Sequence, residues 1–392
     1  MIRWLKSLYH FVVAVCSALY FRFPGSRLTV IGVTGTDGKT TTATLIYEIL
    51  KAAGYKTSMI TSVQAVIAGK TYDTGFHVTT PNAFWVQKYL REAVDHGDSH
   101  VVLEVTSHAL SQSRVWGVHF AVGVLTNVTH EHLDYHKTFE NYLQAKLKLL
   151  RQSGTVIINR DDDALYSTIV PLLRSKSLIT FGIYRQAKIT PQTNPFTTQL
   201  PGEFNIYNCL AAIAATSMLP IPPKTVAAAI KHFPGVPGRM ELVTKTPFTV
   251  IVDFAHTPNA LDRALKTVRE STKGKLIHVF GSAGLRDSSK RPYMGKASAQ
   301  YADEIIITEE DYRTEDIHTI IEQIASGIPV YQKVHKIPDR KEAISFALSV
   351  AQAGDTVMIT GKGHERSLCR GTVEYPWSDQ DTVKKLLKKV TS

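Results

Sequence analysis

The sequence contains few cysteines, and they do not form a recognisable group. Cys16, Cys209 and Cys369 are the only three in a chain of 392 residues, and they lie far apart. An odd and scattered set argues against a disulfide framework and against a cysteine-based zinc site. It suits a reducing compartment, and we therefore expect a cytoplasmic protein.

The sequence also lacks a long tract of lysine and arginine, although its net charge is +11 and its pI is about 9.4. The basic residues are scattered and no aromatic–basic RNA-binding motif occurs, so we expect no nucleic-acid partner. An anionic nucleotide or an anionic membrane surface explains the positive charge equally well. The hydrophobic content of 44% and the charged content of 20% are ordinary for a globular protein of two or three domains.

The first 22 residues include an apolar stretch that is too short to span a membrane. Arg3 and Lys6 precede apolar residues 8–21, which resembles the start of a signal peptide, but no convincing cleavage site follows. A spanning helix needs about 20 apolar residues. Two interpretations stay open. The segment is a helix packed on the protein, or it lies in the inner membrane interface and gives a peripheral contact through residues 1–22.

The stretch VIGVTGTDGKTTTATLIYEIL, residues 30–50, changes from a strand pattern to a helical pattern through a glycine-rich turn. Glycines let backbone N–H groups surround a phosphate, Lys39 adds positive charge, and Thr40 offers a hydroxyl to Mg²⁺ at a helix N-terminus. The spacing departs from the common G-x-x-x-x-G-K-[ST] because Val33 replaces the first glycine. An ordinary strand–turn–helix corner is the alternative. The expected ATP-binding residues of this loop are Thr34, Gly35, Thr36, Asp37, Gly38, Lys39, Thr40 and Thr41.

Apolar runs rich in β-branched residues alternate with helical patterns along most of the chain. This alternation predicts an α/β fold with parallel sheets. A proline- and glycine-rich stretch near Pro237 predicts a domain boundary. We expect an apolar N-terminal helix in residues 1–26, a central ATPase domain in residues 27–237, and a Rossmann-like C-terminal domain in residues 238–392. Strands are expected at residues 28–33, 101–105, 121–126, 155–159, 178–181, 249–252, 276–280, 304–308 and 356–360.

Two further stretches bring candidate metal ligands to the ends of strands. In VVLEVTSHALSQSR, Glu104 ends an apolar strand, where its carboxylate can hold a hard cation. The second, LTNVTHEHLDYHKTFENYLQAKLKLL, is rich in histidine and acidic residues. A zinc site of His130, His132 and His136 is one interpretation. Mg²⁺ with bound phosphate suits a phosphate-binding loop better, since neither a cysteine pair nor an H-E-x-x-H motif is present.

Taken together, the motifs resemble the Mur ligase family, specifically the MurE-type UDP-N-acetylmuramoyl-tripeptide synthetases. The matching stretches run in family order from about residue 28 to the end, which separates the chain from folylpolyglutamate synthases. They are GVTGTDGKTTT, HVTTPNAF, LEVTSHALSQSRV, LTNVTHEHLDYHKTFENYLQAK, GEFNIYNCLAA, VPGRMELV, VDFAHTPNAL, VFGSAGLRDSSKRPYMG and ITGKGHE. The resemblance implies an ATP- and Mg²⁺-dependent ligase of peptidoglycan precursor synthesis, which joins an amino acid to a muramoyl-peptide acceptor through an acyl phosphate.

The resemblance also implies the catalytic residues. Lys39 would bind the β- and γ-phosphates, and Thr40 would bind one Mg²⁺. Glu104 and His132 would hold a second Mg²⁺. Lys146 matches the family's carbamylated lysine, whose added carboxylate would help to position that metal. Two anions must approach each other in this reaction, so cations are needed to screen them.

Other matching residues are implied to bind the three substrates. Those for the acceptor are Thr79, Thr80, Thr106, Gln112 and Arg114. Those for ATP, beyond the loop, are Asn205, Asn208, Arg239, Asp253 and His256. Those for the amino acid are Arg286, Asp311, Arg313, Gly361 and Glu365.

The sequence departs from the family in the motif DNPR, which becomes Asp311-Tyr312-Arg313 within TEEDYRTED. Arginine at this position suits the extra carboxylate of meso-diaminopimelate, because it can form a bidentate pair. Lysine would favour the acidic Glu310 and Asp311. We expect diaminopimelate, with lysine as the alternative. Val78 also differs, since some members have asparagine there.

A second departure concerns the family's uridine-binding N-terminal domain, since only about two dozen residues precede the first strand of the loop domain. A UDP-linked acceptor is therefore open to alternatives. One is a Mur-like ligase that acts on a lipid-linked muropeptide or on a folate- or cyanophycin-like acceptor. Another is a catalytically silent nucleotide-binding partner protein. The presence of Lys39, Thr40, Glu104, His132 and Lys146 argues against a silent protein.

Overall fold

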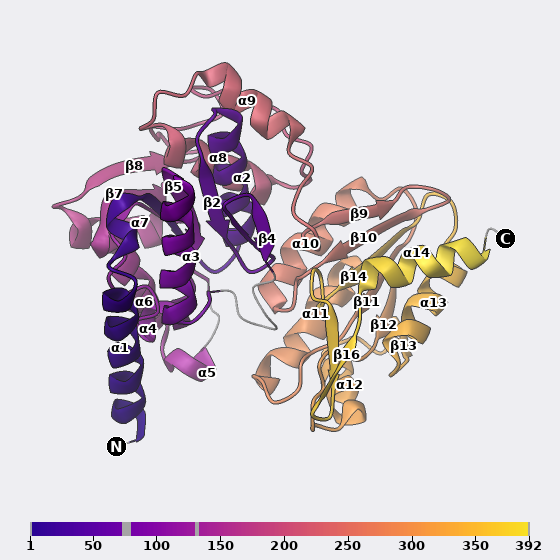
Figure 1. Cartoon of the computed structure of the whole chain (residues 1–392). Helices are drawn as coiled ribbons and strands as arrows, with labels where there is room; N and C mark the ends of the chain where they lie inside the picture. The colour runs from indigo at the N-terminus through magenta and orange to yellow at the C-terminus, as the bar shows by residue number, and fades with distance from the viewer. Residues whose placement is uncertain (1, 73–79, 130–132, 391–392) are drawn as a thin grey trace. The chain divides into compact units, whose positions relative to one another are not determined.

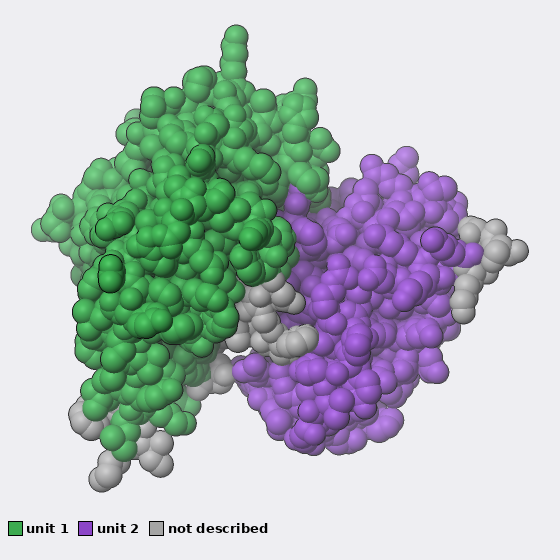
Figure 2. Space-filling view, viewed as in Figure 1, with its two compact units in different colours: residues 1–234 green, residues 235–392 purple. Residues whose placement is uncertain are grey.

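The computed structural model describes residues 2–72, 80–129 and 133–390. The chain divides into two compact units, Met1–Pro234 (unit 1) and Gly235–Ser392 (unit 2). Figure 2 colours the two units separately. Each is described by itself below.

Unit 1 is built on an eight-stranded sheet of order β4-β3-β2-β5-β1-β6-β7-β8. Six strands, in the order β2-β5-β1-β6-β7-β8, are parallel. β3 and β4 extend the sheet beyond β2 in antiparallel pairing. The strands are β1 (Thr29–Thr34), β2 (Thr57–Ile60), β3 (Ala65–Ile67), β4 (Lys70–Tyr72), β5 (His100–Glu104), β6 (Phe120–Leu125), β7 (Ser153–Asn159) and β8 (Ser177–Phe181). In this parallel order, β1, β5 and β6 are neighbours, so the segments that follow them meet at one edge of the sheet.

Helices cover this sheet and supply its core (Figure 1). They are α2 (Lys39–Ala52), α3 (Ala83–His96), α4 (Ser107–Ser111), α5 (Leu133–His136), α6 (Phe139–Gln152), α7 (Asp163–Ile169), α8 (Glu203–Thr216) and α9 (Pro223–His232), with short 3₁₀ turns at Pro24–Arg27 and Val170–Leu173. One apolar cluster joins α3 and α4 to the strands, and another joins α6 and α7 to them. α2 packs against α8 and α9. Side-chain caps begin α3 and α6: the side-chain oxygens of Asn82 and Thr138 accept backbone N–H bonds.

The N-terminal helix α1 (Ile2–Tyr20) packs against α3. The small residues Ala14, Ser17 and Ala18 of α1 are buried. Gly117 follows Trp116 at the same place, and a Cβ on it would lie 3.1 Å from the Ala18 Cβ. Trp116 also contacts the rings of Phe11 and Phe23. No helix in the described part of the chain is long and apolar enough to cross a membrane.

Unit 2 is built on a six-stranded sheet of order β13-β12-β11-β14-β10-β9, parallel except for β9. The strands are β9 (Glu241–Thr244), β10 (Thr249–Asp253), β11 (Leu276–Phe280), β12 (Glu304–Ile307), β13 (Lys333–Lys336) and β14 (Thr356–Thr360). A separate hairpin pairs β15 (Ser367–Arg370) with β16 (Val373–Pro376). The helices are α10 (Pro258–Ser271), α11 (Arg291–Tyr301), α12 (Ile317–Ala325), α13 (Arg340–Val350) and α14 (Asp379–Val390), and a 3₁₀ turn lies at Ser288–Lys290. α13 packs onto the central strands through a continuous apolar cluster.

The predicted α/β class and every predicted strand are confirmed, with ends shifted by up to two residues. The predicted parallel sheets carry three antiparallel strands at their edges, β3, β4 and β9. These edge strands are three or four residues long and partly exposed, so they carry little of the continuous apolar pattern that marks a buried parallel strand.

Candidate active site

The glycine-rich loop lies between β1 and α2 in unit 1. α2 begins at Lys39, so the N–H groups of its first turn face the loop, as in anion-binding sites at helix N-termini. Gly38 has a φ of +77°, and a Cβ on it would lie 2.2 Å from the Asn208 Oδ1. Any larger residue would be strained and would displace Asn208, so this position requires glycine.

The end of β6 holds the loop from the other side. The Asp37 N–H donates to Asn127 Oδ1 at 2.9 Å, and the Asn127 Nδ2 donates back to the Asp37 carbonyl at 3.1 Å. The Thr126 hydroxyl donates to the same carbonyl at 2.6 Å. These bonds fix the loop backbone within the protein itself, which is the pre-organisation that phosphate binding needs.

Glu104 lies beside the start of α2, in contact with the hydroxyl groups of Thr40 and Ser62. Its side chain is 1% exposed. The Thr40 hydroxyl donates to its Oε2 at 3.0 Å, and the Ser62 N–H donates to the same oxygen at 2.9 Å. The Thr40 and Ser62 hydroxyls are 2.9 Å apart. This set of oxygen atoms suits a hard cation such as Mg²⁺.

Two lysines approach carbonyl groups of the loop. Lys39 Nζ donates to the Thr36 carbonyl at 2.7 Å, and Lys146 Nζ donates to the Gly35 carbonyl at 2.5 Å. Lys146 is 1% exposed and its Nζ lies 4.3 Å from the centre of the Tyr142 ring. Tyr142, one turn earlier on α6, is 3.1 Å from the Thr36 hydroxyl through its own oxygen. The loop is therefore in contact with two ammonium groups, which favours a polyanionic ligand.

The predicted metal ligands are brought together only in part. Thr40 and Glu104 are in contact, whereas His132 lies outside the described residues. Within residues 2–72, 80–129 and 133–390, no group of three or more His, Cys, Asp or Glu side chains could hold a metal ion. The oxygen donors at Thr40 and Glu104 nevertheless fit Mg²⁺ rather than zinc, which prefers nitrogen and sulfur.

The residues expected to bind the acceptor form a hydrogen-bonded group next to Glu104. The Thr80 hydroxyl donates to the Glu104 carbonyl at 3.0 Å, and the Thr106 N–H donates to the Thr80 hydroxyl oxygen at 3.1 Å. Arg114 donates to the Thr80 carbonyl at 2.6 Å and to Gln112 Oε1 at 2.7 Å. Burial lowers the pKa of Arg114. Thr79 lies outside the described residues.

The two asparagines of α8 reach the loop helix. Asn208 Nδ2 donates to Asn205 Oδ1 at 3.0 Å, and the Thr42 hydroxyl donates to Asn208 Oδ1 at 3.3 Å. Asn205 in turn donates to the Pro201 carbonyl at 2.7 Å. Of the remaining loop positions, Thr34 and Thr41 are both buried.

In unit 2, Arg239, Asp253 and His256 gather at the carboxyl end of β10. The Arg239 guanidinium lies 4.3 Å from the centre of the Phe254 ring, and the His256 Nδ1 donates to the Phe254 carbonyl at 2.9 Å. Asp253 accepts the N–H groups of Met240 and Ala255, each at 2.7 Å. Burial raises the pKa of Asp253, while Arg239 and the backbone N–H groups act in the opposite direction.

Two of the residues expected to bind the amino acid, Asp311 and Glu365, pair with a buried lysine. Lys362 is completely buried, and its Nζ lies 2.7 Å from Asp311 Oδ1 and 2.5 Å from Glu365 Oε2. Burial opposes the charged form of Lys362, but the two carboxylates outweigh it and raise the pKa of Lys362. Both acidic side chains are thus neutralised within the protein. Arg286 is exposed.

Arg313 has a φ of +53°, in the left-handed region that arginine rarely adopts. Its Nη1 donates to the Gly284 carbonyl at 2.7 Å. Its backbone carbonyl accepts from the Gly371 N–H at 2.8 Å, which links it to the β15–β16 hairpin. A non-glycine residue held in this conformation points to a functional constraint.

Gly361, one residue before Lys362, has a φ of +107°, and a Cβ on it would lie 2.9 Å from Glu310 Oε2. That oxygen of Glu310 is buried without a hydrogen-bond partner in the described structure. Burial raises the pKa of Glu310. A buried oxygen without a partner can form a hydrogen bond with a bound molecule.

Two family models match most of the chain, including most of the residues described above. Residues 33–216 match the Mur ligase middle domain, and residues 238–363 match the Mur ligase, glutamate ligase domain. The chain belongs to the Mur ligase family. It is 41% identical over 386 residues to the UDP-N-acetylmuramoyl-L-alanyl-D-glutamate--2,6-diaminopimelate ligase of Aquifex aeolicus. The alignment covers 94% of this chain and 79% of that protein.

Solved structures agree with the family. A structure of a UDP-N-acetylmuramoyl-L-alanyl-D-glutamate--2,6-diaminopimelate ligase superposes on 93% of this Mur ligase and 79% of that chain, with a TM-score of 0.62 and 29% identity. The Mycobacterium tuberculosis folylpolyglutamate synthase has a TM-score of 0.71 over 89% of this chain and 91% of its own, but only 16% identity. The second likeness shows the fold alone. The predictions of the family, the α/β fold and an ATP-dependent ligase of MurE type in peptidoglycan precursor synthesis are confirmed.

Three residues of the site were not singled out from the sequence of this Mur ligase. Ser62 bonds to Glu104, Asn127 holds the loop, and Lys362 neutralises two carboxylates. Asn127 and Lys362 lie inside the quoted stretches LTNVTHEH and ITGKGHE, so the family pattern could have indicated them. Ser62 follows β2, a strand that the sequence analysis missed, and had no such signal.

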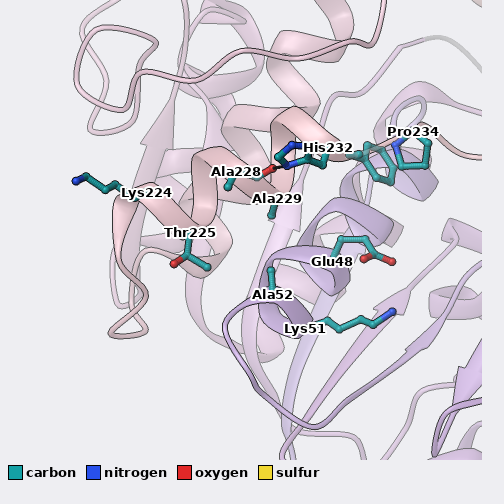
Figure 3. Close-up of a pocket in the computed structure, with 10 residues that line it drawn as sticks. Glu48, Lys51, Ala52, Lys224, Thr225, Ala228, Ala229, His232 and Pro234 are labelled. Atoms are coloured by element: carbon teal, nitrogen blue, oxygen red, sulfur yellow. Dashed lines mark hydrogen bonds between the residues drawn. The ribbon is translucent and has the colours of Figure 1, made fainter.

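A pocket of about 660 Å³ lies elsewhere in unit 1, between the C-terminal half of α2 and α9 (Figure 3). Its lining residues are Glu48, Lys51, Ala52, Lys224, Thr225, Ala228, Ala229, His232, Phe233 and Pro234. Glu48 is nine residues beyond Lys39, or roughly 13 Å along the helix axis. None of the predicted site residues lines this pocket, so it is separate from the loop site of this Mur ligase.

Proposed function

We propose that this Mur ligase uses ATP to join meso-diaminopimelate to the peptide carboxylate of a muramoyl-peptide acceptor. The observation that carries the choice of amino acid is the buried Lys362, which already pairs with Asp311 and Glu365. These carboxylates would therefore offer little to the free ammonium of a lysine side chain. Arg313, whose Nη2 lies 4.0 Å from Asp311 Oδ2, would pair with the distal carboxylate of diaminopimelate. The relatives named as diaminopimelate ligases support this choice.

The reaction would proceed in two steps. The acceptor carboxylate attacks the γ-phosphate of ATP, which gives an acyl phosphate and ADP. The amine of diaminopimelate then attacks the acyl carbon, inorganic phosphate leaves, and an amide forms. Lys39, beside the Thr36 carbonyl, would hold the β- and γ-phosphates, and the N–H groups at the start of α2 would stabilise the same charge.

Mg²⁺, when bound, would screen the phosphate charge from the attacking carboxylate. Thr40 and Glu104 would hold it, and His132 would complete the group. Lys146 would contribute as a carbamate, in which carbon dioxide has added to its amine. That change turns a buried cation into an anion on a long arm beside Gly35, which is the chemistry a cation-binding ligand needs.

The other substrate contacts follow from position. Thr80, Thr106, Gln112 and Arg114 would bind the acceptor, since they are bonded together beside Glu104, and Thr79 would join them. Asn205, Asn208, Arg239, Asp253 and His256 would bind ATP, with Arg239 on phosphate and Asp253 on ribose. The pocket for the amino acid would be formed by Arg286, Arg313, Gly361 and Glu365, together with Asp311.

The cytoplasm supplies ATP and the precursors of this reaction. We place the activity there, with peripheral contact between residues 1–22 and the inner face of the membrane. The helix α1, which leaves large apolar side chains such as Leu19 and Tyr20 exposed, supports this placement.

Release of phosphate from ATP, screened over acceptors and amino acids together, tests the function. We expect release that requires both a muramoyl-dipeptide acceptor and an amino acid, with diaminopimelate preferred to lysine. Release that is independent of the amino acid would contradict a ligase. Preference for a folate-type acceptor would contradict the acceptor class.

A further inference from the structure

The helix α1 presents apolar side chains to solvent. Seven of these exposed residues follow helical spacing and lie on one face of the helix. They are Leu5, Leu8, Tyr9, Val12, Cys16, Leu19 and Tyr20, whereas Phe11, also exposed, lies outside this face against Trp116. Figure 1 shows α1 at the N-terminal end of the chain. Tyr9 is 65% exposed, Leu19 is 58% and Tyr20 is 75%. A helix on the surface of a soluble domain normally directs its polar side outward, so this orientation is inverted.

The inverted orientation is fixed by the packing of the opposite face. Ala14, Ser17 and Ala18 are buried, and the Ala18 Cβ lies within 3.1 Å of the place where a Cβ on Gly117 would be. The Ser17 hydroxyl is bonded within the helix to the Val13 carbonyl at 2.7 Å. Small residues allow this close backbone approach, and Phe11 packs on Trp116 beside it, whereas the larger apolar residues listed above point to solvent.

Aromatic side chains extend the apolar face at the end of α1. The rings of Phe21 and Phe84 are 5.1 Å apart, and Tyr20 lies 6.4 Å from Phe84. Trp85 follows at 6.0 Å from Phe84, and the Lys88 Nζ lies 4.5 Å from the Trp85 ring. Phe84 and Trp85 are each 42% exposed. Exposed aromatic rings next to a lysine are typical of protein surfaces at the boundary between lipid and water.

The charge of this segment has one sign. The first acidic residue of the chain is Asp37, whereas Arg3, Lys6, Arg22 and Arg27 precede it. The whole chain has 34 acidic residues in 392, so a segment of this length without one is a local bias. Basic residues next to an exposed apolar face favour binding to anionic lipid.

We propose that the outward face of α1, continued by Tyr20, Phe84 and Trp85, lies in the headgroup region of an anionic phospholipid membrane. The helix lies along the surface rather than across it. This inference rests on the proposed function only for the choice of the inner membrane face. A second copy of the chain fits the face less well, because a symmetric contact would bring Lys6 and Arg22 of both copies together without an acidic residue from the segment.

Co-sedimentation with vesicles tests the proposal. One vesicle type contains phosphatidylcholine alone, and the other contains equal parts of phosphatidylcholine and phosphatidylglycerol. We expect the full chain to bind the second type much more strongly. The triple variant Leu8→Gln/Val12→Gln/Leu19→Gln should partition into the vesicles about tenfold or more weakly. Each substitution removes apolar groups that the membrane would bury.

A matched control replaces three exposed apolar residues outside the face, Leu172→Gln/Met218→Gln/Val330→Gln, and should bind as the unchanged chain does. A charge variant, Lys6→Gln/Arg22→Gln, should bind phosphatidylglycerol vesicles about fivefold more weakly for each charge removed. Circular dichroism checks that each variant keeps its helix content.

Three outcomes would overturn the proposal: failure of the unchanged chain to bind either vesicle, equal loss in the matched control, or a dimer in light scattering that the triple variant abolishes. The last result would make the face an interface between copies. Phosphate release measured without vesicles separates this inference from the enzyme. The triple variant should keep it, and its absence in the unchanged chain would contradict the ligase but not the membrane contact.

Discussion

The loop site of unit 1 and the lysine-centred site of unit 2 use charge in opposite ways. Around the loop, charge lies against neutral groups: Lys39 contacts the Thr36 carbonyl, and Glu104 contacts hydroxyl groups. In unit 2, charge faces charge. Lys362 joins Asp311 to Glu365, Arg340 pairs with Asp379 at 2.7 Å, and Arg370 pairs with Glu309.

The difference indicates separate physical tasks. Ions held by neutral groups retain their field for a charged ligand, so the loop is suited to bind and activate phosphate. Ions that neutralise each other fix the shape of a pocket and are costly to disturb one at a time. Substitutions in the loop site should therefore impair the reaction, and those around Lys362 should impair stability.

The largest effect is expected from Lys146→Ala. Loss of the anion that this residue would carry as a carbamate should lower ligation by about 10²–10³-fold or more, with ATP binding nearly unchanged. Added bicarbonate or short carboxylates should restore part of the activity. Steady-state phosphate release and nucleotide titration measure both quantities, and Lys148→Ala, an exposed lysine on the same helix, is the control.

Wild-type activity in Lys146→Ala would refute this assignment. So would mass spectrometry that finds an unmodified Lys146 in the active, metal-bound protein.

The next effect concerns Lys362→Met, which removes the buried cation that joins Asp311 to the partly buried Glu365. Breaking a buried ion pair in this way typically costs about 3–5 kcal/mol in the free energy of unfolding. Urea unfolding should show this loss. The double variant Lys362→Met/Asp311→Asn removes one of the stranded charges and should recover part of it. If both variants have the same free energy of unfolding as the unchanged chain, the pairing of Lys362 does not stabilise the pocket.

Arg313→Ala should act on the amino acid alone. Losing a bidentate pair to a distal carboxylate typically costs about 2–5 kcal/mol, so the KM for diaminopimelate should rise strongly while that for ATP stays constant. The KM for lysine should change much less. Arg366→Ala, an exposed arginine paired with Asp381, is the control. If the unchanged enzyme prefers lysine, or if both amino acids suffer equally, Arg313 is a structural residue.

The smallest effect is a pH dependence in unit 2. Burial, aided by the nearby Arg340, lowers the pKa of His278 to about 3. Its unfolded pKa is about 6.5, so the neutral folded form contributes stability above that pH and loses it as pH falls toward 3. Between pH 7 and 5 the loss should be about 2 kcal/mol. His278→Gln, measured by urea unfolding at both values, should lack this part, and an equal pH dependence would contradict it.

The central strands could be predicted from the sequence because they are buried on both faces. β1, β5, β6, β10 and β14 appear as continuous apolar runs, which need no partner to be recognised. β13 could not, since its sequence KVHK contains a single apolar residue and it becomes a strand by pairing with β12. β16 is exposed along its whole length and depends on β15 in the same way.

The loop site could be predicted as far as its residues follow strands. Lys39 and Glu104 come shortly after β1 and at the end of β5, and adjacent parallel strands bring their ends together. The lysine-centred site could be predicted only as a set of family positions. Lys362 and Asp311 are 51 positions apart, and no local pattern shows that one neutralises the other.

The packing of α1 on Trp116 has an optical consequence. Of the four tryptophans in the chain, Trp4 belongs to α1, and Trp85 and Trp116 lie on the segments beside it. The fourth, Trp377, is the sole tryptophan of residues 235–392, and its indole N–H donates to Asp379 at 2.8 Å. Emission from unit 1 therefore arises from the surroundings of this helix. A Trp377→Phe chain reports by its fluorescence on unit 1 alone, and the difference from the unchanged chain follows unit 2 without any attached dye.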